Sequence, residues 1–199
     1  MRMAPACRGT PFKSLAAAIA ATVIFSIASV GASQAEPNAS ALTPWRAGVA
    51  SDFTLPSTTG LPIRLAAQRG QIVLVHFFAT WCEPCREELA ALRRLVARTE
   101  PQSMTVLAIS VAEVDLRVQR FLQTIPVNFP VLLDRDRAVA KAWKISTLPS
   151  TVILDGSLKP RLVVETDFAW DQIEPSALIA RIKSAQTSRT EQSHKGEKL

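Results

Sequence analysis

The pattern of apolar and polar positions predicts alternating strands and helices through the middle of the chain. Two apolar runs, 72–78 and 104–111, have the length and β-branched content of strands buried on both faces, and only His76 interrupts the first. Helical spacing of apolar residues follows each run, at 83–98 and at 116–124. The middle of the chain therefore predicts two successive strand–helix units.

The same spacing predicts which helical side chains face the core. In the first helix we expect an apolar face of Leu89, Leu92, Leu95 and Val96 and an outer face of Glu87, Glu88, Arg93, Arg94 and Arg98. In the second helix we expect the inward positions to be Leu116, Val118, Phe121 and Leu122.

Shorter segments complete the predicted domain. We expect short strands at 52–55, 60–65, 131–133, 150–154 and 161–165, and helices at 138–143 and 176–183. Asp155-Gly156 is a turn signal that joins the last two strands as an antiparallel hairpin. The order predicts an α/β fold with a central mixed sheet, helices on both faces and extra N-terminal strands.

The first 35 residues have the order of a secretory signal. Three basic residues precede an uncharged run of 16 residues, 15–30, and Ser33 and Ala35 fit the small positions before a cleavage site. The run is shorter than the roughly 20 residues that span a bilayer, although an uncleaved anchor is the alternative. We expect a signal or anchor at 1–35, a linker at 36–50, a domain at 51–185 and a disordered polar tail at 186–199.

The net charge of +6 gives little support for nucleic-acid binding. Three of the 23 basic residues belong to the predicted signal, which leaves +3 for the rest of the chain. No basic stripe interleaved with aromatic residues is present in the sequence. We therefore expect no nucleic-acid partner.

Removal of the signal would leave Cys82 and Cys85 as the only cysteines, because Cys7 lies within it. A structural disulfide across so short a loop would stabilise the fold little, and a zinc site needs about four ligands. His76 and His194 lie far apart along the chain. Redox chemistry is the interpretation that remains, without a metal or another cofactor.

The position of the pair predicts which cysteine attacks. Cys82 follows a buried strand and opens a helix, where free backbone amides favour a thiolate, so we expect it to be the nucleophile. Cys85, about one turn later, would then resolve the mixed disulfide. Pro84 is compatible with a first helical turn, and the charge of Glu83 should weaken the thiolate and favour a reductant.

The segment 77–85, Phe-Phe-Ala-Thr-Trp-Cys-Glu-Pro-Cys, resembles the active-site stretch of the TlpA/ResA group of exported thioredoxin-like reductants. Segments 109–113, 127–134 and 147–155 resemble three further stretches of that group in the same order. The resemblance covers about residues 50–185 and implies a thioredoxin-like fold.

The resemblance also implies roles for residues outside the pair. Pro149 would be a cis-proline that leaves the backbone of Leu148 free to pair with a client peptide, although an ordinary proline at the start of a strand is the alternative. Glu113 would assist proton transfer between the cysteines, unless it only favours a helix N-terminus. Trp81 would belong to the docking surface rather than the core. His76 departs from the group, and it is either a proton-exchanging group beneath Cys85 or a buried neutral histidine.

These expectations describe an enzyme, an exported or periplasmic protein-disulfide reductase. Its clients would be apocytochrome c segments of the type Cys-x-x-Cys-His or copper-assembly proteins, and a membrane electron carrier would reduce it again. Membrane contact is expected only if the N-terminal segment is retained, and the protein is expected to be a monomer. The alternatives are a copper-handling binding module and, less favoured, a thiol peroxidase.

Overall fold

A computed structural model gives the fold and describes residues 41–100 and 102–184. The predicted signal or anchor, residues 36–40 of the predicted linker and the whole predicted tail lie outside these residues. Within the described part of the chain, no helix is long and apolar enough to cross a membrane.

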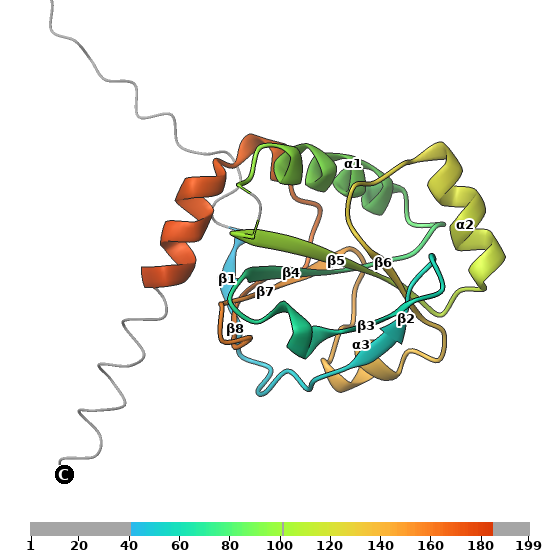
Figure 1. Cartoon of the computed structure of the whole chain (residues 1–199), viewed down its shortest axis with the longest axis horizontal. Helices are drawn as coiled ribbons and strands as arrows, with labels where there is room; N and C mark the ends of the chain where they lie inside the picture. The colour runs from blue at the N-terminus through green and yellow to red at the C-terminus, as the bar shows by residue number, and fades with distance from the viewer. Residues whose placement is uncertain (1–40, 101, 185–199) are drawn as a thin grey trace, which may run out of the picture. The chain divides into compact units, whose positions relative to one another are not determined.

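A six-stranded mixed sheet forms the centre of the domain (Figure 1). Its strands, in spatial order, are β1 (Thr43–Pro44), β8 (Pro160–Val164), β7 (Ser150–Leu154), β4 (Ile72–Phe78), β5 (Met104–Val111) and β6 (Val131–Asp134). Strands β4, β5 and β6 are parallel, whereas β7 and β8 run antiparallel as a hairpin beside β4. The prediction of a mixed sheet with a parallel first half is therefore confirmed.

Helices cover both faces of this sheet. The remaining elements are α1 (Glu83–Ala97), α2 (Asp115–Thr124), α3 (Ala138–Ala142), the short 3-10 helices η2 (Leu65–Gln68) and η3 (Trp170–Gln172), and a separate hairpin of β2 (Thr54–Pro56) and β3 (Pro62–Arg64). Residues 175–184 form a further helix. Helices α1, α2 and 175–184 pack on one face, and α3 packs on the other. This arrangement confirms the predicted thioredoxin-like layering.

The alternation along β4 decides which side chains reach the active site. Leu74 and Phe78 belong to the clusters that include α1, whereas Val75 and Phe77 pack in the cluster around α3. Because successive side chains of a strand point to opposite faces, His76 lies on the α1 face with Leu74 and Phe78. This is also the face that carries the two cysteines.

Two expectations about the borders of the core are wrong. Residues 41–50, which their composition assigned to a linker, include strand β1 and the buried side chains of Leu42 and Trp45. Leu116, expected to point inward, is 55% exposed. It lies two residues before the buried Val118, and two residues rotate a helix by about 200° to the opposite face.

Candidate active site

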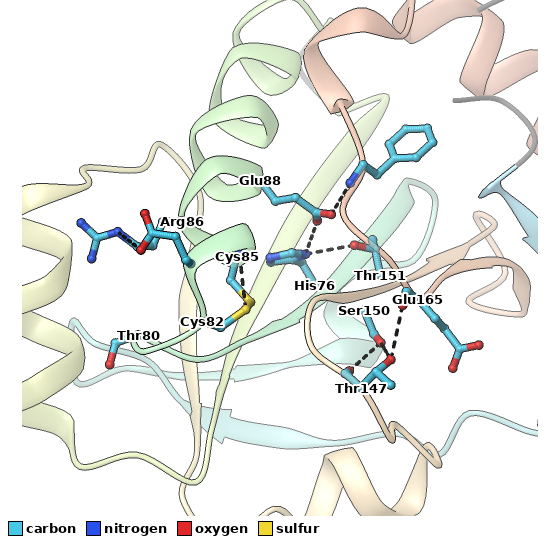
Figure 2. Close-up of a disulfide and its surroundings, with 12 residues drawn as sticks. His76, Thr80, Cys82, Cys85, Arg86, Glu88, Thr147, Ser150, Thr151 and Glu165 are labelled. Carbon is cyan, nitrogen blue, oxygen red and sulfur yellow. Dashed lines mark hydrogen bonds and ion pairs between the residues drawn. A yellow bond between two sulfur atoms is a disulfide. The ribbon is translucent and has the colours of Figure 1, made fainter. Parts of the chain in front are cut away.

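Four residues separate the end of β4 from the start of helix α1, which has Cys82 at its N-cap and Cys85 in its first turn (Figure 2). Cys82 is the residue that caps the helix, and its sulfur accepts a hydrogen bond from the backbone amide of Cys85 at 3.3 Å. Pro84 lies in the first turn, where a missing amide hydrogen costs nothing. The two cysteines form a disulfide with Cα atoms 5.3 Å apart.

Cys82 and Cys85 differ in their exposure to solvent. Cys82 keeps 6% of its surface accessible, and Cys85 has none. Trp81, directly before the pair, is 70% exposed. A partner can therefore reach Cys82 beside an exposed indole, whereas Cys85 can react only with Cys82.

The charge of Glu83 is less influential than its position in the sequence suggests. Its side chain is 81% exposed, and its carboxylate lies 3.6 Å from the guanidinium of Arg86. The Arg86 guanidinium also stacks over the ring of Phe121, 5.3 Å from the centroid. Because water and a neighbouring cation screen the carboxylate, its effect on the thiolate should be small.

His76 is fully buried beneath the disulfide, between Cys85 and the side chains of Glu88 and Thr151 (Figure 2). Its Nδ1 atom lies 2.9 Å from Thr151 Oγ1 and 3.4 Å from Glu88 Oε2. The opposite ring nitrogen, Nε2, has no hydrogen-bond partner among the described residues. Burial lowers the pKa of His76 to about 3, so the imidazole is neutral at physiological pH.

The predicted position of Glu88 on the outer face of α1 is wrong. It was expected on the outer face of α1, but its side chain is buried. Its Oε1 accepts a hydrogen bond from the backbone amide of Phe168 at 2.6 Å, and its Oε2 accepts one from Trp170 Nε1 at 3.1 Å. Burial raises the pKa of Glu88 to about 7 although these hydrogen bonds oppose the shift. The contact with His76 is therefore one between a neutral ring and a carboxyl group that is half protonated near pH 7.

One feature of the sequence does indicate that Glu88 is buried, namely its position three residues after Cys85. Residues three apart lie on the same face of a helix, and Cys85 is buried on the face that packs against the sheet. The two donors of Glu88 come from residues about 80 positions later. No local pattern in α1 could have revealed them.

Glu113 lies at the carboxyl end of β5 and holds the turn that precedes Cys82. Its carboxylate accepts hydrogen bonds from the backbone amide of Thr80 at 2.8 Å, from the hydroxyl of Thr80 at 2.5 Å and from the hydroxyl of Ser110 at 2.8 Å. Three donors thus occupy the carboxylate. The carboxylate therefore ties Thr80, two residues before Cys82, to the end of β5.

The Leu148–Pro149 peptide bond is cis and lies at the start of β7. Leu148 packs against the cluster that contains both cysteines. It takes no part in the pairing of β7, which begins at Ser150. Leu148 is therefore available beside the disulfide for contact with another chain.

The described residues hold no group of three or more histidine, cysteine or carboxylate side chains that could bind a metal ion. His194 lies outside those residues. The cysteine pair is closed as a disulfide in this structure, so its sulfurs are committed to each other.

Comparison with known proteins places this site in a family. The profile of the AhpC/TSA family matches residues 47–159. The chain is 36% identical to the thiol-disulfide oxidoreductase ResA of Bacillus subtilis over 53% of this chain, but the match spans only 59% of that protein. It is 32% identical to ResA of Geobacillus thermodenitrificans over 63% of this chain and 72% of that protein.

A solved structure agrees with these matches. The thiol:disulfide interchange protein of the thioredoxin family from Chlorobium tepidum is 23% identical, with a TM-score of 0.59, over 71% of this chain and 97% of that protein. This likeness establishes the fold. The chain therefore belongs to the AhpC/TSA family, in the group of thioredoxin-like proteins that includes the ResA oxidoreductases.

Proposed function

We propose that this protein is a thiol–disulfide oxidoreductase that reduces disulfides of client proteins. The observation that carries the proposal is the pair at the start of α1, with Cys82 accessible and Cys85 enclosed. The names of the ResA relatives support the same reaction class. The structure contains the oxidised form, which is the product of one reducing cycle.

The cycle has two exchange steps. The Cys82 thiolate attacks one sulfur of the client disulfide, which breaks that bond and forms a mixed disulfide with Cys82. The Cys85 thiolate then attacks the sulfur of Cys82, restores the Cys82–Cys85 disulfide and releases the second client thiolate, which takes a proton from water. Two electrons pass from the dithiol to the client, and an external dithiol must return them.

His76 and Glu88, which are buried beneath Cys85, can accept the proton of the Cys85 thiol. Cys85 must lose this proton before it can attack the mixed disulfide. With Glu88 ionised, the proton of His76 is held on Nδ1, which lies 2.9 Å from Thr151 Oγ1 and 3.4 Å from Glu88 Oε2, and Nε2 is left without a proton or a hydrogen-bond partner. The Cys85 thiol can then pass its proton to Nε2 while the Nδ1 proton moves to Glu88. The imidazole stays neutral throughout, which agrees with a pKa of about 3, and Glu88, with a pKa of about 7, becomes the final acceptor.

The roles of the remaining predicted residues follow from their contacts. Glu113 positions Thr80 and the nucleophile rather than transferring protons. Trp81 and Leu148 contribute to the docking surface, and Pro149 places Leu148 there. Pro84 allows the first turn, and Glu83 has a minor effect on the thiolate.

The cellular role follows from the sequence pattern. Because the first 35 residues have the order of a secretory signal, we place the protein outside the cytoplasm, cleaved or anchored. Clients of the type Cys-x-x-Cys-His in apocytochromes c, or copper-assembly proteins, suit a reductant in that compartment. A membrane electron carrier is the proposed donor, and the protein is proposed to act as a monomer.

Three assays on the purified protein separate this function from the alternatives. We expect reduction of insulin disulfides when an excess of a small dithiol is supplied, without turnover of peroxide and without tight binding of copper(I). Peroxide turnover faster than insulin reduction would favour a thiol peroxidase. Stoichiometric copper(I) binding without disulfide reduction would favour the copper-handling module.

The relay has a separate test in the rate of the resolving step. We expect the release of a preformed mixed disulfide to accelerate with pH and to level off near pH 7. Glu88→Gln should remove that inflection, and His76→Asn should slow the step at all pH values. An unchanged pH profile and redox potential in His76→Asn would remove His76 from the mechanism.

A further inference from the structure

A groove beside the disulfide is lined by mostly apolar residues and one charged residue. This cavity of about 280 Å³ is lined by Trp81, Val111, Ala112, Arg137, Ala140, Ile145, Ser146, Thr147 and Leu148. Trp81 is the neighbour of the nucleophile, and Leu148 packs against the cysteine cluster. A peptide whose cysteine reaches Cys82 therefore has the groove directly beside it.

Most of the lining is apolar, contributed by the indole and by aliphatic side chains. Ser146 and Thr147 add small polar groups. Among the lining residues, Arg137 alone carries a charge. The surface of the groove is thus mostly apolar, and the guanidinium of Arg137 is its single cationic group.

The guanidinium of Arg137 has no partner within the described part of the chain, and the residue is exposed. Two residues earlier, Arg135 is held by both carboxylate oxygens of Asp115 at 2.7 and 2.6 Å. The carboxylates on either side of Arg137 have other partners. Asp134 accepts from the backbone amides of Val139 and Ala140, and Asp136 accepts from that of Ala138. Among the residues that the structure describes, no carboxylate therefore pairs with the guanidinium of Arg137.

We propose that this groove selects client segments with an acidic side chain close to the reactive cysteine, and that Arg137 binds its carboxylate. The inference rests on the proposed function and deepens it by naming the substrate class. The planar guanidinium can form two parallel hydrogen bonds to a carboxylate. The apolar wall between Trp81 and Leu148 accommodates the aliphatic or aromatic neighbours of that acid.

The contact between an exposed arginine and a peptide carboxylate should change the rate by about twofold to fivefold. The effect of this contact on the rate should also weaken with salt. The screening length for exposed charges is about 8 Å at physiological ionic strength and becomes shorter as salt is added. A matching contribution to the association rate is expected, since complementary charges steer the encounter.

The test uses the reduced full-length protein and short synthetic peptides that contain one internal disulfide. The peptides are identical except for Asp, Asn or Lys at one position, placed in separate series one, two or three residues before or after the reactive cysteine. We measure the second-order rate of peptide reduction at low and high salt. In at least one series, the wild-type protein should prefer Asp to Asn by about twofold to fivefold, and the preference should shrink at high salt.

Arg137→Gln should abolish the preference for Asp over Asn. Arg137→Glu should reverse the preference in favour of Lys. Arg93→Gln is the matched control, because Arg93 is exposed on α1, forms no side-chain ion pair with another described residue and does not line the groove.

An Asp preference that survives in Arg137→Gln, or is missing from every series with the wild-type protein, overturns the assignment of Arg137. The proposed function survives that result as long as the Asn peptides are reduced. If the wild-type protein reduces none of the peptides, the proposed function itself fails, and this inference fails with it.

Discussion

The substitution Glu88→Gln tests the buried site through the pH dependence of folding stability. Glutamine preserves the shape of the side chain but cannot ionise. Its amide nitrogen would face either Phe168 N–H or Trp170 Nε1–H, so one donor loses its acceptor. We therefore expect the variant to be less stable than the wild type at pH 5 by about 1–3 kcal/mol.

The sign of the pH effect follows from the raised pKa. The folded protein holds the Glu88 proton up to about pH 7, whereas the unfolded chain releases it near 4.5. The contribution of Glu88 to stability is thus fully present below about pH 4.5 and is lost as the pH rises through about 7. Between pH 5 and pH 8 the loss amounts to about 2–3 kcal/mol, because one pKa unit corresponds to about 1.4 kcal/mol.

Urea unfolding of the oxidised wild type and of Glu88→Gln, at pH steps from 5 to 8, measures this difference without titration of the cysteines. The two free energies of unfolding should converge as the pH rises. The exposed neighbour Glu87 supplies the control, because Glu87→Gln makes the same replacement on the same helix at a position outside the buried site. A constant difference between wild type and Glu88→Gln across the range would show that Glu88 does not titrate there, and the relay would lose its proton acceptor.

Three further predictions concern the surroundings of the pair. The lowered pKa of His76 means that its contribution to stability is present above about pH 6.5 and is lost as the pH falls through about 3. The free energy of unfolding of His76→Asn should therefore fall less steeply with acid than that of the wild type. Parallel curves of this free energy against pH would contradict the burial of a neutral ring. Glu113→Gln should lower the free energy of unfolding by about 1–3 kcal/mol, because one of its three donors from Thr80 and Ser110 would face an amide nitrogen; a slower attack by Cys82 on a model disulfide should accompany the loss, and unchanged stability would remove its positioning role. Glu83→Gln should shift the redox potential by less than about 30 mV, because the carboxylate is exposed and lies beside Arg86; equilibration with glutathione measures the shift, and a larger one would restore the importance of this charge.

The central strands were predictable because their burial leaves a local signature. The apolar runs predicted β4 and β5 with their observed bounds, and the predicted strand at 150–154 matches β7. The motif at 81–85 is also recognisable from the sequence, because its chemistry depends on five consecutive positions. A buried strand followed closely by a helix places Cys82 at a helix start without knowledge of distant contacts.

Such patterns indicate the face of α1 that carries Glu88, through its spacing of three residues from Cys85, but not the hydrogen-bond partners of its carboxyl group. Glu88 has the charge of a surface residue, and its burial depends on donors at Phe168 and Trp170 that approach only in the folded chain. Trp45 was likewise assigned to a linker because its neighbours are small and polar, whereas β1 pairs with β8 and brings the indole into the core. In both cases the deciding partners lie far along the sequence.

The trapping of a mixed disulfide tests the central claim most directly. Cys85→Ala and Cys82→Ala, each with Cys7→Ser so that a single thiol remains, are mixed with an excess of a cystine peptide and analysed by intact mass under non-reducing conditions. We predict that Cys85→Ala accumulates a stable adduct on Cys82, whereas Cys82→Ala forms little because Cys85 is enclosed. Equal or faster trapping by Cys82→Ala would contradict the assignment of Cys82 as the nucleophile.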